Sequence, residues 1–192
     1  MSPILVTYAS KHGHTRKVAA RIAATAQAAG ASVDVLDVAA AAHVDPVDYD
    51  AVVVGDSIHA GKHQREIVDW ATAHHTALNA RPSAFFTVCL TAAEDTAESR
   101  AATATYLDDF LRATGWTPAT TATFAGALQY REYDFMTRLL VRLLMRKFGR
   151  PTDASRDYDY TDWGAVERFG RACAALAAEP AGRPAGRLTQ TP

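Results

Sequence analysis

The fold is decided by the stretch Ile4-Leu5-Val6-Thr7-Tyr8-Ala9-Ser10-Lys11-His12-Gly13-His14-Thr15. It begins with apolar residues typical of a buried strand. It ends in small, hydroxylated and glycine residues that lead directly into an alanine-rich helical run. A strand that turns into a helix in this way is typical of a phosphate cradle, because backbone N–H groups and the helix N-terminus face one anion. In a doubly wound α/β sheet, such a junction lies where ligands bind.

The loop sequence also distinguishes between kinds of phosphate ligand. It contains neither G-x-G-x-x-G nor G-K-[ST], which argues against a dinucleotide fingerprint and against a P-loop. One terminal phosphate fits better and suggests a mononucleotide such as FMN. The alternative is an ordinary capped turn between a strand and a helix. The residues that we expect to hold the phosphate are Ser10, Lys11, His12, Gly13, His14 and Thr15.

Composition indicates one globular domain. The chain has 192 residues, a formal net charge of −1 and 48% hydrophobic residues, which do not favour nucleic acid as a partner. Cys89 and Cys173 lack C-x-x-C spacing, and no stretch looks like a signal peptide, so we expect a cytoplasmic protein. We expect one domain over residues 1–178 and a disordered tail, rich in Pro, Gly and Ala, over residues 179–192.

Strand-like and helix-like runs alternate along the chain. Strands are predicted at residues 4–8, 33–38, 51–55, 84–90 and 121–127, and helices at 15–29, 63–75, 96–114 and 161–178. Gly30 and Gly115 are predicted to end helices in the left-handed conformation, and Thr161 or Asp162 to cap the last one. This alternation predicts an α/β fold with a five-stranded parallel sheet and right-handed crossovers. The expected strand order is 2-1-3-4-5.

Two further loops follow strands that end at the same edge of this sheet. The loop after the third strand, residues 55–63, has two glycines for tight turns and Ile58 as an apolar wall for a flat ring. The loop after the fourth strand, residues 89–92, is expected to flank that ring through its backbone. The alternatives are a glycine-bounded surface loop and, for Cys89, a buried strand residue.

Four histidines gather on the first two loops: His12, His14, His59 and His63. Their spacing matches no zinc pattern, and we expect no metal. No nucleophile elbow or Ser/His/Asp signature is present. The chemistry is therefore left to a cofactor, which the protein positions.

Residues 128–155 interrupt the alternation and predict a helical insertion after the fifth strand. Between residues 126 and 150 there are six basic and two acidic residues, a net charge of +4. A basic stripe beside apolar residues can lie on an anionic membrane, and the same charges can also receive the carboxylates of a ligand or an acidic partner. The alternative is a helix that packs on its own domain or on a second copy, which would make a homo-oligomer. The stripe consists of Arg138, Arg142, Arg146 and Arg150.

These features together resemble the flavodoxin-like, menaquinone-dependent protoporphyrinogen IX dehydrogenases, over residues 4–178. The motifs that carry the resemblance are Lys11-His12-Gly13-His14-Thr15-Arg16, Gly55-Asp56-Ser57-Ile58, Gly61-Lys62-His63, Pro82-Ser83-Ala84-Phe85-Phe86, Ala125-Gly126-Ala127-Leu128 with Tyr130 and Tyr133, and Tyr160-Thr161-Asp162-Trp163. The chain departs from the family pattern at His59-Ala60, where Arg-Tyr is common, at Cys89, where asparagine is common, and at His12, which replaces an acidic residue.

The resemblance implies non-covalent FMN and electron transfer from a porphyrinogen to a quinone. We expect the flavin ring to be framed by Ser57, Ile58, His59, Phe86, Thr87, Val88, Cys89, Leu90 and Thr91. Removal of a pyrrole proton needs a base, for which His59 and His63 are the candidates. The alternatives are an FMN-dependent quinone or nitro-compound reductase and a non-enzymatic electron carrier. A carrier is expected to be strongly acidic, which a net charge of −1 does not favour.

Overall fold

Five strands pair side by side, all parallel, in the order β2-β1-β3-β4-β5. The computed structural model describes residues 3–128, 153 and 155–178. The sheet confirms the expected doubly wound fold and its strand order. Its strands are β1 (Pro3–Tyr8), β2 (Ser32–Asp37), β3 (Ala51–Ser57), β4 (Ser83–Cys89) and β5 (Thr120–Ala125).

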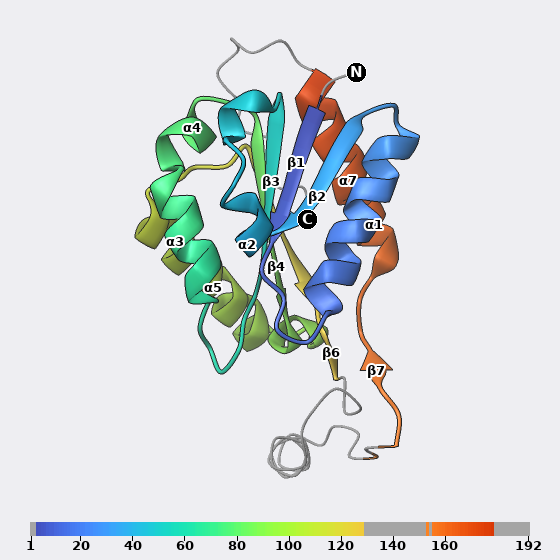
Figure 1. Cartoon of the computed structure of the whole chain (residues 1–192). Helices are drawn as coiled ribbons and strands as arrows, with labels where there is room; N and C mark the ends of the chain where they lie inside the picture. The colour runs from blue at the N-terminus through green and yellow to red at the C-terminus, as the bar shows by residue number, and fades with distance from the viewer. Residues whose placement is uncertain (1–2, 129–152, 154, 179–192) are drawn as a thin grey trace.

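Helices cover both faces of this sheet (Figure 1). Helices α1 and α7 lie side by side on one face, and α3 and α5 cover the other. Short helical turns fill the connections between them. The helical elements are α1 (His14–Ala28), α2 (Val38–Ala41), η1 (Pro46–Asp48), α3 (Arg65–Ala73), α4 (His75–Asn79), η2 (Leu90–Ala93), α5 (Ala97–Thr114) and α7 (Trp163–Ala178).

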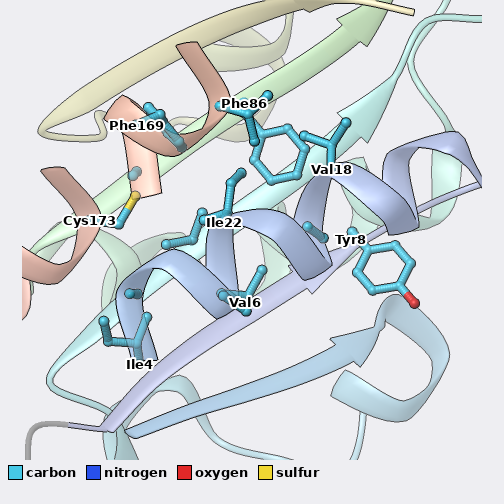
Figure 2. Packing of buried hydrophobic residues seen from close by; sticks show 14 of the residues in the cluster. Ile4, Val6, Tyr8, Val18, Ile22, Phe86, Phe169 and Cys173 are labelled. Atoms are coloured by element: carbon cyan, nitrogen blue, oxygen red, sulfur yellow. The ribbon is translucent and has the colours of Figure 1, made fainter. Parts of the chain in front are cut away.

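Alternate strand residues point to opposite faces, so the sheet builds two cores. On the side of α1 and α7, Val6, Ile22 and Phe86 are all fully buried in one cluster (Figure 2). On the other side, Phe85 stacks on Phe110 with 4.1 Å between the ring centroids. Together these cores hold the carboxyl ends of the strands, and the loops that follow them, in fixed positions.

Several element boundaries differ from the prediction. Strand β2 begins at Ser32, because Ser32 pairs with Pro3 of β1. The helix predicted over residues 63–75 begins only at Arg65, because the backbone of Gln64 is extended. It also stops at Ala73, and His74, with a φ of −104° and a ψ of 8°, separates α3 from α4.

The strand predicted over residues 121–127 is divided in two. It ends at Ala125, and β6 (Ala127–Leu128) then pairs antiparallel with β7 (Tyr158–Asp159), which lies after the insertion. The two ends of the insertion therefore meet at one small ladder (Figure 1). Apart from residues 128, 153 and 155, the helical insertion predicted over residues 128–155 falls outside the described residues, as does the predicted tail, so both stay predictions. In the described part of the chain, no helix combines the length and the apolar character needed to cross a membrane.

Candidate functional site

Three loops meet at the carboxyl edge of the sheet, as the strand order requires. The backbone N–H of Ala9 donates to Gly55 O at 3.0 Å, and that of Ile58 donates to Val88 O at 3.0 Å. The His12 and His59 rings touch edge to face, with 5.3 Å between their centroids. The structure thus brings the predicted phosphate loop and the loops after β3 and β4 together.

The phosphate loop surrounds the start of α1. Gly13 has a φ of 82°, a left-handed conformation that favours glycine and that directs the chain into the helix. The backbone N–H of Arg16 donates to Ser10 Oγ at 3.3 Å. A hollow of about 400 Å³ opens here; it is lined by Tyr8, Ser10, Lys11, His12, Gly13, Arg16, Lys17 and Asp37.

The hollow is electropositive. Three cations, Lys11, Arg16 and Lys17, face the single carboxylate of Asp37, which caps α2 by accepting from Ala40 N at 2.9 Å. None of the three cations forms an ion pair with any residue in the ranges 3–128 and 155–178 or with residue 153. An excess of cations over acidic groups, next to a helix N-terminus, favours an anionic ligand.

His14 is turned away from this hollow. Thr161 Oγ1 donates its proton to Ala125 O at 2.9 Å. The same oxygen therefore accepts the hydrogen bond from His14 Nε2, which lies 2.7 Å away. Burial lowers the pKa of His14, although Asp159 lies 3.8 Å away and raises it. His14 therefore links the start of α1 to the segment that follows the insertion. Thr15 is also buried.

The loop after β3 ends in a tight turn. His59 and Lys62 exchange backbone hydrogen bonds of 2.9 and 3.0 Å across Ala60 and Gly61, whose φ angles are 50° and 75°. Inside the turn, the Gln64 side-chain amide donates to Ser57 Oγ at 2.7 Å, and Ser57 Oγ lies 3.1 Å from His59 Nε2. The predicted ring contacts Ser57, Ile58 and His59 thus share one loop, with Ile58 and His59 half-buried.

A buried acid–imidazole pair anchors this loop to α5. His63 Nε2 donates to the carbonyl of Tyr106 at 2.7 Å, and Nδ1 lies 2.5 Å from Asp56 Oδ2. Burial raises the pKa of Asp56. Burial alone would lower the pKa of His63, but the Asp56 carboxyl outweighs it and raises that pKa. One proton therefore lies between the two groups, and both nitrogens of His63 are engaged by the protein.

The side chains of β4 that precede the third loop are buried in the fold. Phe86, Thr87 and Val88 are buried within the layers of the fold, and Phe86 belongs to the core on the side of α1 and α7 (Figure 2). Cys89 is 3% exposed, and burial raises the pKa of its thiol. Leu90 and Thr91, both in η2, are half-buried at the edge of the site.

The sequence alone assigned no role in the site to six residues that lie here, although three of them stand in the motifs quoted above. The six are Arg16, Lys17, Asp37, Asp56, Gln64 and Thr161. Arg16 and Lys17 follow the phosphate loop by one and two positions, so a search for cations on the first helical turn would have found them. Thr161, predicted only as a helix cap, lies 147 positions from His14, and no local pattern signals the contact between them. The base role proposed for His59 or His63 stays a prediction.

Comparisons with known proteins agree with this geometry. Residues 5–155 match the family model described as a flavodoxin domain. The protoporphyrinogen IX dehydrogenase [quinone] of Leishmania major is 35% identical over 98% of this chain and 81% of the relative. The enzyme of the same name from Escherichia coli K12 is 34% identical over 92% of this chain and 97% of the relative.

Solved structures share the fold at low identity. An archaeal flavodoxin has a TM-score of 0.53 at 16% identity, covering 92% of this chain and 99% of its own. A short-chain flavodoxin associated with a PDU bacterial microcompartment has a TM-score of 0.58 at 15% identity, with the same coverage. Since fold, site geometry and full-length similarity agree, this chain belongs to the flavodoxin-domain family, in the group of the quinone-dependent protoporphyrinogen IX dehydrogenases.

Proposed function

We propose that this protein is an FMN-dependent oxidoreductase that oxidises protoporphyrinogen IX to protoporphyrin IX with a quinone as electron acceptor. The observation that carries the proposal is the electropositive hollow at the β1–α1 junction, in a chain whose full-length relatives are named for that reaction. The excess of three cations over one carboxylate matches the charge of one terminal phosphate dianion.

The residues present fit FMN. The glycine turn and the backbone of residues 10–13, together with Lys11, Arg16 and Lys17, suit the phosphate. Ile58 and the backbone of residues 89–91 suit the edge of a flat apolar ring. Bound FMN supplies two-electron redox chemistry, while the protein binds, orients and shields the reactants.

The phosphate site has a specific test, since riboflavin is FMN without the phosphate. We expect Lys17→Gln to raise the dissociation constant of FMN about tenfold, because a charge-assisted contact is lost, and to leave riboflavin binding unchanged. Fluorescence titration of the flavin-free protein measures both constants. Arg65→Gln, which removes an exposed cation of α3, is the matched control. Equal losses for FMN and riboflavin would contradict a phosphate site in the hollow.

The activity has its own assay. We expect purified protein to carry or take up FMN and to oxidise protoporphyrinogen IX in a quinone-dependent manner. Protein that cannot be loaded with FMN would disprove the proposal. Reduction by a nicotinamide cofactor with inert porphyrinogen would identify a quinone or nitro-compound reductase. A stable one-electron-reduced flavin without turnover would identify an electron carrier.

A peripheral membrane contact completes the proposal. A lipid-soluble quinone is met at the bilayer, and the sequence places Arg138, Arg142, Arg146 and Arg150 at helical spacing. We propose that this stripe contacts anionic lipid. The alternative ligands for this stripe are the propionates of the substrate, an acidic partner protein and a second copy of the chain.

A further inference from the structure

The ring of His59 is held by a directional chain of hydrogen bonds. The side-chain NH₂ group of Gln64 is a hydrogen-bond donor, and it donates to Ser57 Oγ at 2.7 Å. Ser57 Oγ then lies 3.1 Å from His59 Nε2. Ser57 is 6% exposed, so its hydroxyl proton needs an acceptor inside the protein.

That acceptor is the imidazole. Apart from His59 Nε2, the described residues offer the Ser57 hydroxyl proton no hydrogen-bond acceptor. If His59 Nε2 carried a proton, the serine oxygen would accept twice and its own buried proton would be left unpaired, at a cost of about 1–3 kcal/mol. The arrangement that satisfies every group runs from Gln64 to Ser57 to Nε2. The ring proton of His59 is then on Nδ1.

Burial is the main reason why the ring of His59 stays neutral. Burial lowers its pKa to about 4, and the nearby positive groups of His12 and Lys11 add to the effect. Near neutral pH the ring is therefore uncharged, with its Nε2 lone pair occupied by Ser57. In the described part of the chain no group accepts from Nδ1, and the ring meets His12 of the phosphate loop edge to face.

We propose that His59 is a hydrogen-bond donor to bound FMN, fixed in its Nδ1–H form by the positioning residues Ser57 and Gln64, and that it is not the general base. The inference rests on the proposed function for its ligand, but the tautomer is a property of the protein itself.

One substitution should reverse the chain of hydrogen bonds. Gln64→Glu replaces the donating amide by an accepting carboxylate of nearly the same shape. The Ser57 hydroxyl then donates to that carboxylate and accepts from His59, so the ring proton moves to Nε2. Gln64→Asn keeps an amide but shortens its reach, and Ser57→Ala removes the link altogether.

Nitrogen-15 NMR of histidine-labelled protein reads the tautomer directly. At pH 8, with and without FMN, we expect His59 to be Nδ1–H in the wild type and Nε2–H in Gln64→Glu. A loss of the tautomer preference is expected in Ser57→Ala. An Nε2–H form in the wild type, or an unchanged form in Gln64→Glu, would overturn the inference.

Flavin titration tests the donor. His59→Asn can place an amide N–H close to the position of Nδ1, whereas His59→Gln places its amide near Nε2. We expect His59→Asn to bind FMN within about twofold of wild type, and His59→Gln and His59→Leu to bind about three- to tenfold more weakly. Equal affinity in all three variants would overturn the donor role. Wild-type protein that binds no FMN would overturn the proposed function and, with it, the donor role of His59. The NMR experiment without FMN would still test the tautomer by itself.

Discussion

At the scale of single residues, Gly55 shows how tightly the site is built onto the core. It pairs with Phe86 across β3 and β4, and a Cβ atom on residue 55 would lie 2.1 Å from Phe86 Cζ. We expect Gly55→Ala to lower the free energy of unfolding by about 1–3 kcal/mol through overpacking, measured by urea denaturation. Adding Phe86→Leu should recover part of the loss. Gly126→Ala, whose new Cβ would meet nothing closer than 3.5 Å, is the control, and an equal loss there would contradict this explanation.

Acid should destabilise the protein through His59. Burial and nearby positive groups lower its pKa from 6.5 to about 4, so as pH falls the unfolded chain takes up the proton first. The contribution of His59 to the free energy of unfolding is fully present above pH 6.5, and it is lost as the pH falls from 6.5 towards 4. Between pH 7.5 and pH 5, the wild type should lose about 1 kcal/mol more than His59→Asn, after allowance for solvent screening of a half-buried ring. Parallel losses in urea titrations at both pH values would disprove this assignment.

At the scale of elements, the start of α1 is tied to the segment between β7 and α7. His14 donates to Thr161, which donates to Ala125 at the end of β5. Thr161→Val keeps the shape but leaves buried groups on both sides unpaired, so we expect a loss of about 1–3 kcal/mol in unfolding free energy. Hydrogen exchange should also rise in both α1 and residues 158–163. Thr105→Val, on an exposed part of α5, should change neither.

The local sequence pattern predicted the helices and strands well, but it predicted poorly the contacts between segments that are far apart in the sequence. The end of α5 at Gly115, with a φ of 66° and an N–H···O bond to Leu111 of 3.0 Å, follows from glycine alone. The strand order follows from the alternation of elements, because parallel crossovers leave few topologies. The turn of His14 towards Thr161 could not be predicted, since its partner lies beyond the insertion. Nor could the sequence predict on which face of the sheet Phe86 is buried, since both faces of a continuous apolar strand are covered.

At the scale of the whole molecule, the charge of the chain is divided unevenly. The chain carries −1 overall, yet residues 126–150 carry +4. We expect binding to anionic vesicles that weakens as salt increases, because polybasic segments are attracted within a Debye length of the surface. Arg138→Glu combined with Arg142→Glu should weaken it while FMN content and urea stability stay the same. Unchanged vesicle binding and quinone turnover would remove the membrane from the proposal.

The β6–β7 ladder makes the insertion a removable module. Since Leu128 and Tyr158 already face each other as an antiparallel pair, an Asn-Gly dipeptide can join them as an ordinary two-residue hairpin. Such a shortened chain should fold and take up FMN with unchanged affinity, because the described loops of the site lie on the remaining elements. If it still turned over porphyrinogen but no longer bound vesicles, flavin chemistry and lipid targeting would be separable parts. The excised segment could then be grafted onto the same ladder position of another flavodoxin.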